Sequence, residues 1–89
     1  MEVNISLTFE RDLQRLKNAF LEKKSSAFVQ EIMNASNVET LTQIKKMKGA
    51  SFLYRKRIGD YRIGFSREEN GSILLRRIAH RKDIYKVFP

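Results

Sequence analysis

The chain has no cysteine, a single histidine and a single proline, which is its last residue. Without cysteine it forms no disulfide, offers no thiol nucleophile and holds no metal through thiolates. One histidine excludes a metal site built on several histidines, so we expect no metal centre and no cofactor. Its apolar runs are too short to span a bilayer, and the N-terminus lacks the basic and hydrophobic blocks of a signal peptide. We therefore expect a soluble, cytoplasmic protein that does not enter membranes.

Acidic residues are scarce in the second half of the chain. Residues 1–44 carry five Lys/Arg and six Asp/Glu, whereas residues 45–89 carry thirteen Lys/Arg and four Asp/Glu. The formal net charge of +8 therefore comes from the second half. Such an asymmetry is typical of a basic face that binds nucleic acid or another polyanion. A solvated surface that promotes solubility is the alternative interpretation.

The length of 89 residues predicts one domain, 1–89. Alternating apolar residues from Val3 to Leu7 indicate a short strand. Thr8 then predicts a helix cap, and apolar residues recur at helical spacing from Phe9 to Phe20, which we interpret as a core stripe. Ser25 or Ser26 predicts the start of a second helix that ends near residues 36–37. The segment 41–49 fits a short helix or an ordered connection that Gly49 ends.

After Gly49 the apolar period becomes that of strands. Three strands are predicted at 52–58, from Tyr61 to Phe65 or Arg67, and at 72–79. Gly59-Asp60 and Asn70-Gly71 are favourable turns between them. The fold class is therefore α+β: an N-terminal strand and a two-helix hairpin packed on an antiparallel sheet that a C-terminal three-stranded meander completes.

The Gly59-Asp60 turn places arginines together. Antiparallel pairing around this turn sets Arg57 opposite Arg62, and Arg55 joins them on the same face. Like charges opposite each other destabilise a sheet, so the pattern indicates an anion such as phosphate among the three guanidinium groups. Lys56 falls on the other, apolar face, and we expect its stem to be buried and its ammonium group to reach an edge.

Three motifs resemble those of the RelE/ParE superfamily of toxin–antitoxin toxins. They are the lysine-rich segment 45–49, the segment Tyr-Arg-Lys-Arg-Ile-Gly-Asp-Tyr-Arg at 54–62, and His-Arg-Lys-Asp-Ile-Tyr at 80–85. The resemblance spans almost the whole chain. It implies a RelE-like fold and a cognate acidic antitoxin as partner.

The resemblance leaves the activity open between two target classes. RelE-like members act on the ribosome and cut messenger RNA, and the run of arginines favours this activity. ParE-like members inhibit DNA gyrase, and an inactive antitoxin-binding member is a third possibility. Arg55 and Arg57 stand where well-studied RelE toxins carry lysines, which keeps the gyrase alternative open because arginine is a poor base.

RNA cleavage by attack of the 2′-hydroxyl on the adjacent phosphate needs a base, an acid and positive charge around the phosphate. The resemblance implies that a set of C-terminal-half residues supplies these roles: Arg55, Arg57, Arg62, His80, Arg81 and Tyr85. His80 is the candidate for proton transfer, beside the basic face, or else a packing residue. Tyr85 would stack on a base, or else pack on the sheet. The lysines Lys45, Lys46, Lys48 and Lys82 would contact RNA phosphates, or else be solvated.

Overall fold

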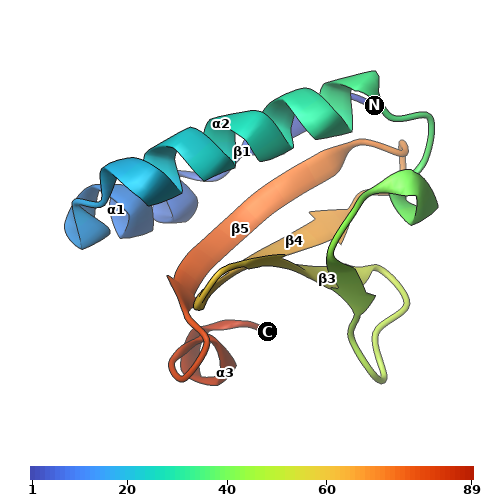
Figure 1. Ribbon diagram of the computed structural model, residues 1–89. Coiled ribbons are helices and arrows are strands. Elements are labelled where there is room, and N and C mark those ends of the chain that lie inside the picture. The colour runs from blue at the N-terminus through green and yellow to red at the C-terminus, as the bar shows by residue number, and fades with distance from the viewer.

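The computed structural model describes residues 1–89. The elements, in chain order, are β1 (Val3–Ile5), α1 (Leu7–Leu16), α2 (Ala19–Asn34), the 3₁₀ turn η1 (Val38–Thr40), β2 (Ile44–Lys46), β3 (Leu53–Ile58), β4 (Tyr61–Arg67), β5 (Ile73–His80) and α3 (Ile84–Val87). The strands form one sheet in the order β1-β5-β4-β3-β2. Helices α1 and α2 cover one face, and α3 lies with the C-terminus on the other (Figure 1). The predicted α+β fold class is confirmed.

The sheet is antiparallel except at one edge, where β1 pairs with β5 in parallel. The predicted three-stranded meander is β3, β4 and β5, and both predicted turns are present. Gly59 has φ 56° while Asp60 keeps a negative φ, the combination that a type II′ hairpin turn requires. No helix of the structure combines the length and the apolar character needed to cross a bilayer.

The N-terminal caps differ from those predicted. Ser6, not Thr8, caps α1 by accepting a hydrogen bond from the Phe9 amide at 3.0 Å. Asn18, not Ser25 or Ser26, caps α2. Lys17 adopts a left-handed φ of 48° and ends α1 within what looked like one apolar stripe. As a consequence Phe20 belongs to α2 and is 52% exposed, so its predicted place in the core is wrong.

The segment after η1 contains a strand that the sequence did not reveal. β2 pairs antiparallel with β3, with Lys45 opposite Arg55. Neither the predicted short helix nor an ordered connection describes it. Its three residues include only one apolar side chain, too few to display a period of two. The strand extends the sheet on the side where the arginines lie.

A β-bulge interrupts the pairing of β4 with β5. Gly64 pairs with Arg77 and Phe65 pairs with Leu75, so Arg76 has no partner on β4. Because side chains alternate along a strand, the extra residue reverses the faces of the β5 residues that follow it. The bulge therefore decides which face each residue near the end of β5 occupies.

Two apolar clusters of unequal size lie on opposite faces of the sheet. The larger has thirteen buried residues and lies under the helices, with Phe65 stacked on Tyr54 and edge-on to Phe28. The smaller consists of Leu53, Ile84 and Phe88 and holds α3 against the opposite face. The helix face thus supplies most of the apolar burial that stabilises the fold.

Arg77 leaves the sheet face and joins β5 to α1. Its Nε and Nη2 donate to the two carboxylate oxygens of Asp12 at 2.8 and 3.1 Å. The same carboxylate accepts the Ile78 amide at 3.1 Å, beyond the point where β1 stops pairing with β5. Asp12 therefore satisfies backbone and side-chain donors at this edge of the sheet.

Lys56 is placed as predicted, with a buried stem on the helix face. Its ammonium lies 5.0 Å from the Phe28 ring centroid and donates to Glu31 at 3.3 Å and to the Thr42 carbonyl at 2.8 Å. Partial burial works against charge on Glu31, but hydrogen bonds from Thr42 and the nearby Lys56 outweigh it and lower its pKa below 4.5. The group thus fastens β3 to α2.

This lowered pKa predicts a loss of stability in acid. A carboxyl whose pKa is lower in the folded state stabilises the protein fully above its unfolded pKa, near 4.5. The contribution is lost as the pH falls from there through the lower folded pKa. We expect Glu31→Gln to lower the unfolding free energy at pH 7 by about 1–3 kcal/mol and less at pH 3. Equal losses at both pH values in chemical denaturation would contradict the assignment.

Candidate functional site

The predicted arginine face forms a hollow at the β2 side of the sheet. Its volume is about 240 Å³, and its lining residues are Gln43, Ile44, Lys45, Arg55, Arg57 and Arg62. The pairings Lys45 with Arg55 and Arg57 with Arg62 bring four cations together. We call this the cationic hollow. Its size and charge suit a phosphate group.

Arg62 is the most constrained of these cations. Its Nη1 donates to the carbonyls of Gly59 and Tyr61, both at 2.9 Å, so the hairpin turn fixes the guanidinium. Partial burial, together with the positive charges of Arg57 and Arg81, lowers the pKa of Arg62 from its ordinary value. Because arginine stays protonated in proteins, the side chain is a positive charge that the hairpin turn holds in place.

No acidic side chain forms an ion pair with the cationic hollow. The four ion pairs of the structure use Asp12 twice, Glu31 and Asp83 as their acids. Their basic partners are Arg15, Arg77, Lys56 and Lys86. Only the charge of Asp60, which acts on Arg62 without forming an ion pair, offsets part of the repulsion among these cations, and the rest is left to solvent or a bound anion.

A second hollow of about 260 Å³ adjoins the first and shares Lys45 and Arg55 with it. Its other lining residues are Lys46, Met47, Lys48 and Tyr85. The Arg55 guanidinium lies 4.5 Å from the centroid of the Tyr85 ring, which is 70% exposed. The Nε of Arg55 is buried and has no hydrogen-bond partner. Arg55 is therefore held by stacking, between a cationic hollow and a ring that can accept a planar ligand.

The segment after β5 brings further positive charge to the hairpin. The Arg81 amide donates to the Asp60 carbonyl at 2.8 Å, which ties this segment to the turn. Arg81 is exposed and close enough to Arg62 to affect its pKa. Lys82 is also exposed, and its amide donates to His80 Nδ1 at 3.1 Å. Arg81 therefore adds positive charge beside Arg62.

His80 lies on the helix side of the sheet, so its predicted position beside the basic face is wrong. It pairs with Tyr61, and the two rings meet edge-to-face at 5.3 Å. Both rings line a hollow together with Asp12 and Leu16 of α1. The bulge at Arg76 causes this reversal. Without it Ile78 would lie opposite Arg62, and His80, two residues further along, would share that basic face; with it Ala79 lies opposite Arg62.

The remaining predicted residues converge more closely than the sequence indicated. Lys45, Lys46 and Lys48 form a cluster continuous with the arginines, because β2 pairs with β3. The sequence also gave no sign that Phe88 packs on Gly64, which is the partner of Arg55. No group of three or more His, Asp or Glu side chains comes together to hold a metal ion.

Comparisons with known proteins place the chain among toxins. No protein-family model matches it. Over its full length it is 40% identical to the full length of toxin RelE3 of Methanocaldococcus jannaschii. It superposes with a TM-score of 0.79 on a chain of the RelB–RelE antitoxin–toxin complex from Methanococcus jannaschii, at 34% identity over 97% of this chain and 99% of that one. The archaeal RelE–RelB complex from Pyrococcus horikoshii OT3 shares the fold, with a TM-score of 0.71 and 24% identity over 90% and 93% of the two chains.

The two-helix layer on a five-stranded sheet is the fold of these solved toxin chains, and the protein is a small α+β toxin. The chain belongs to the RelE family, as the identity over its whole length shows.

Proposed function

We propose that the protein is the toxin of a toxin–antitoxin pair and that it cleaves messenger RNA on the ribosome. The observation that carries the proposal is the cationic hollow, in which four cations meet without an acid and adjoin the exposed Tyr85 ring. Membership of the RelE family supports it. The two hollows match the two parts of a nucleotide, a phosphate and a base.

The chemistry proposed is transfer within the RNA backbone. A 2′-hydroxyl loses its proton to water and attacks the adjacent phosphorus, which forms a 2′,3′-cyclic phosphate. The 5′-oxygen leaves and takes a proton from water, and negative charge grows on the phosphate oxygens in between. Arg57 and Arg62, fixed on neighbouring strands, stabilise this charge in place. Because His80 lies on the helix side, the proposal routes no proton transfer through it. The hollow's contribution is to bind and stabilise the reacting phosphate.

The surrounding residues bind the rest of the RNA. Tyr85 offers its exposed ring for stacking on an unpaired base. The lysines of the second hollow, with Arg81 and Lys82, contact phosphates of messenger or ribosomal RNA, and this binding weakens as salt rises. These contacts are sequence-independent, so the ribosome supplies the register.

The partner proposed is an acidic antitoxin. The solved relative from Methanococcus jannaschii is a toxin chain in complex with RelB. A partner with acidic residues would neutralise the cations of the hollow, which repel one another in the free toxin. Its binding would compete with RNA for the same cations.

The test uses the purified protein in a cell-free translation system with stalled ribosomes, followed by mapping of messenger RNA ends. We expect cuts within the codon in the ribosomal A site, and their loss when the antitoxin is added. A supercoiling assay with DNA gyrase is run in parallel. Intact RNA together with inhibited gyrase would overturn the proposal in favour of a gyrase inhibitor.

A further inference from the structure

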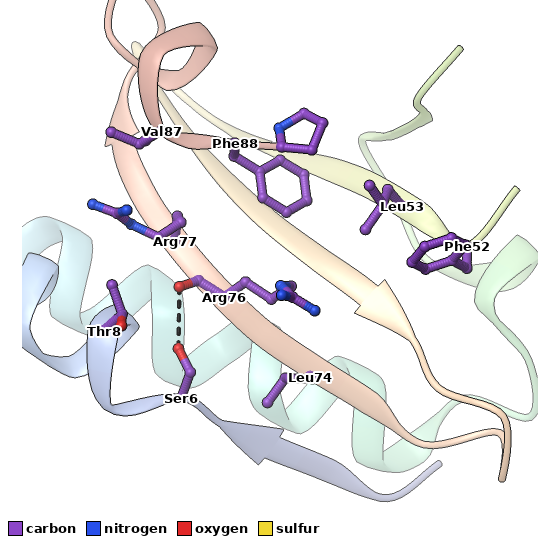
Figure 2. A pocket seen from close by; sticks show the side chains of 10 residues that line it. Ser6, Thr8, Phe52, Leu53, Leu74, Arg76, Arg77, Val87 and Phe88 are labelled. Carbon is purple, nitrogen blue, oxygen red and sulfur yellow. Dashed lines mark hydrogen bonds between the residues drawn. The ribbon is translucent and has the colours of Figure 1, made fainter. Parts of the chain in front are cut away.

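The C-terminal segment rests on the sheet through two buried side chains. Ile84 is 0% exposed and Phe88 is 3% exposed, and both pack against Leu53. Between them in sequence, Tyr85 is 70% exposed. Figure 2 shows the Phe88 ring lying across the sheet, between β5 with Arg76 and Arg77 and the strand that carries Leu53. Ile84 and Phe88 thus anchor α3 at both ends, whereas the Tyr85 side chain between them is exposed beside Arg55.

The Phe88 ring packs directly on Gly64, and we call this contact its seat. A Cβ atom at this position would overlap three atoms of the Phe88 ring, so the ring lies directly on the backbone of β4. Gly64 is fully embedded in the strand and is not at a positive φ, so the turn-forming freedom of glycine does not explain it. The explanation is the close approach of the aromatic ring.

The same strand pair connects this contact to the cationic hollow. Gly64 pairs directly with Arg55, whose guanidinium stacks on the Tyr85 ring at 4.5 Å. Phe88 follows Tyr85 by three residues and donates its amide to the Ile84 carbonyl, which closes the turn of α3. The contacts therefore close on themselves: Gly64 pairs with Arg55, Arg55 stacks on Tyr85, Tyr85 shares α3 and its last turn with Phe88, and Phe88 packs on Gly64.

We propose that Phe88, seated on Gly64, is a positioning residue that holds Tyr85 against Arg55 and so fixes the wall between the two hollows. Phe88 is almost fully buried, so it does not touch the RNA itself. The inference rests on the proposed function only in naming RNA as the ligand. The thirteen-residue core lies on the other face, so we expect the fold to persist when the anchor is removed.

The first arm of the test is spectroscopic and independent of activity. The Gly64 α-protons lie beneath the Phe88 ring, so the ring current shifts their NMR signals upfield in the wild-type protein. Phe88→Ala removes this shift, and Phe20→Ala, a truncation on the helix side, keeps it. Unshifted Gly64 signals in the wild type, or signals that Phe88→Ala leaves unchanged, overturn the inference.

The second arm measures binding of a single-stranded 2′-O-methyl oligonucleotide, which cannot be cut at its 2′ positions. We expect Phe88→Ala to weaken binding about tenfold, the size of one lost stacking interaction. Phe88→Leu fills the same seat without a ring, so it restores binding but not the upfield shift. A lower melting temperature with unchanged affinity would show a merely structural role and would overturn the inference.

A double-mutant cycle tests the seat itself. Gly64→Ala lifts the ring by steric overlap, so we expect the same loss of affinity as in Phe88→Ala, and little further loss in the double variant. Additive losses contradict a shared mechanism. In the ribosome assay, Phe88→Ala should lower kcat about tenfold or more with KM changed less. The reason is that the variant loses the alignment of the bound RNA in the site, while its association with the ribosome is unaffected. If the wild type cuts no RNA, the proposed function fails, and the NMR and oligonucleotide arms still decide this inference.

Discussion

Arg62→Ala is expected to lower the rate of ribosome-dependent RNA cleavage by about 10²–10³-fold, the usual cost of removing one fixed donor to a developing oxyanion. Arg62 has the largest expected effect in the cationic hollow because the Gly59 and Tyr61 carbonyls fix its guanidinium before substrate binds. Mapping and counting messenger RNA ends after single-turnover reactions gives the rate.

The same substitution should not weaken the fold. It removes one of two like charges that face each other across β3 and β4, which offsets the loss of the two hydrogen bonds to the turn carbonyls, so the melting temperature should change little. Arg67→Ala is the matched control, since Arg67 is exposed on the same strand and lines neither hollow. Arg62→Lys keeps the charge without the planar fork, so it should recover part of the activity. Cleavage at the wild-type rate by Arg62→Ala would remove the hollow from the mechanism.

Asp12→Ala is expected to lower the free energy of unfolding by about 3–5 kcal/mol, as when one partner of a buried ion pair is removed. The Asp12 side chain is 6% exposed and accepts three hydrogen bonds, two from Arg77 and one from the Ile78 amide. Its removal leaves a guanidinium and a buried amide without a partner at the edge of the sheet. Equilibrium urea denaturation measures the loss.

The neighbouring pair of Asp12 with Arg15 supplies the control. Its 3.9 Å separation and the 74% exposure of the Arg15 side chain predict a change within about 0.5 kcal/mol for Arg15→Ala. A loss for Asp12→Ala no larger than that for Arg15→Ala would show that the contacts of Asp12 do not stabilise the edge.

The hairpin of β3 and β4 was predictable because its signals are local. Alternating apolar residues and the Gly59-Asp60 turn determine the register of β3 and β4, and that register alone puts Arg57 opposite Arg62. The confirmed burial of the Lys56 stem follows from the same alternation. These inferences need only the alternation of apolar residues along each strand and the position of the Gly59-Asp60 turn.

The features that were missed depend on contacts between distant segments. β2 is defined by its pairing with β3 rather than by its own pattern. The break at Lys17 leaves the apolar spacing of the two helices almost unchanged, so nothing in the period marks it. Phe88 meets Gly64 across 24 positions of sequence, and a glycine in a strand carries no sign of which ring will cover it.

The bulge at Arg76 gives the end of β5 an unusual evolutionary property. If β5 kept all its residues but paired without the bulge, Arg76 would lie opposite Gly64 and the faces of Ala79 and His80 would be exchanged, while β1 still held the start of the strand in register. A protein of this fold can thus gain or lose an imidazole beside its cationic hollow without replacing any amino acid. The gain or loss of a β-bulge, as well as substitution, can therefore diversify the chemistry of this sheet.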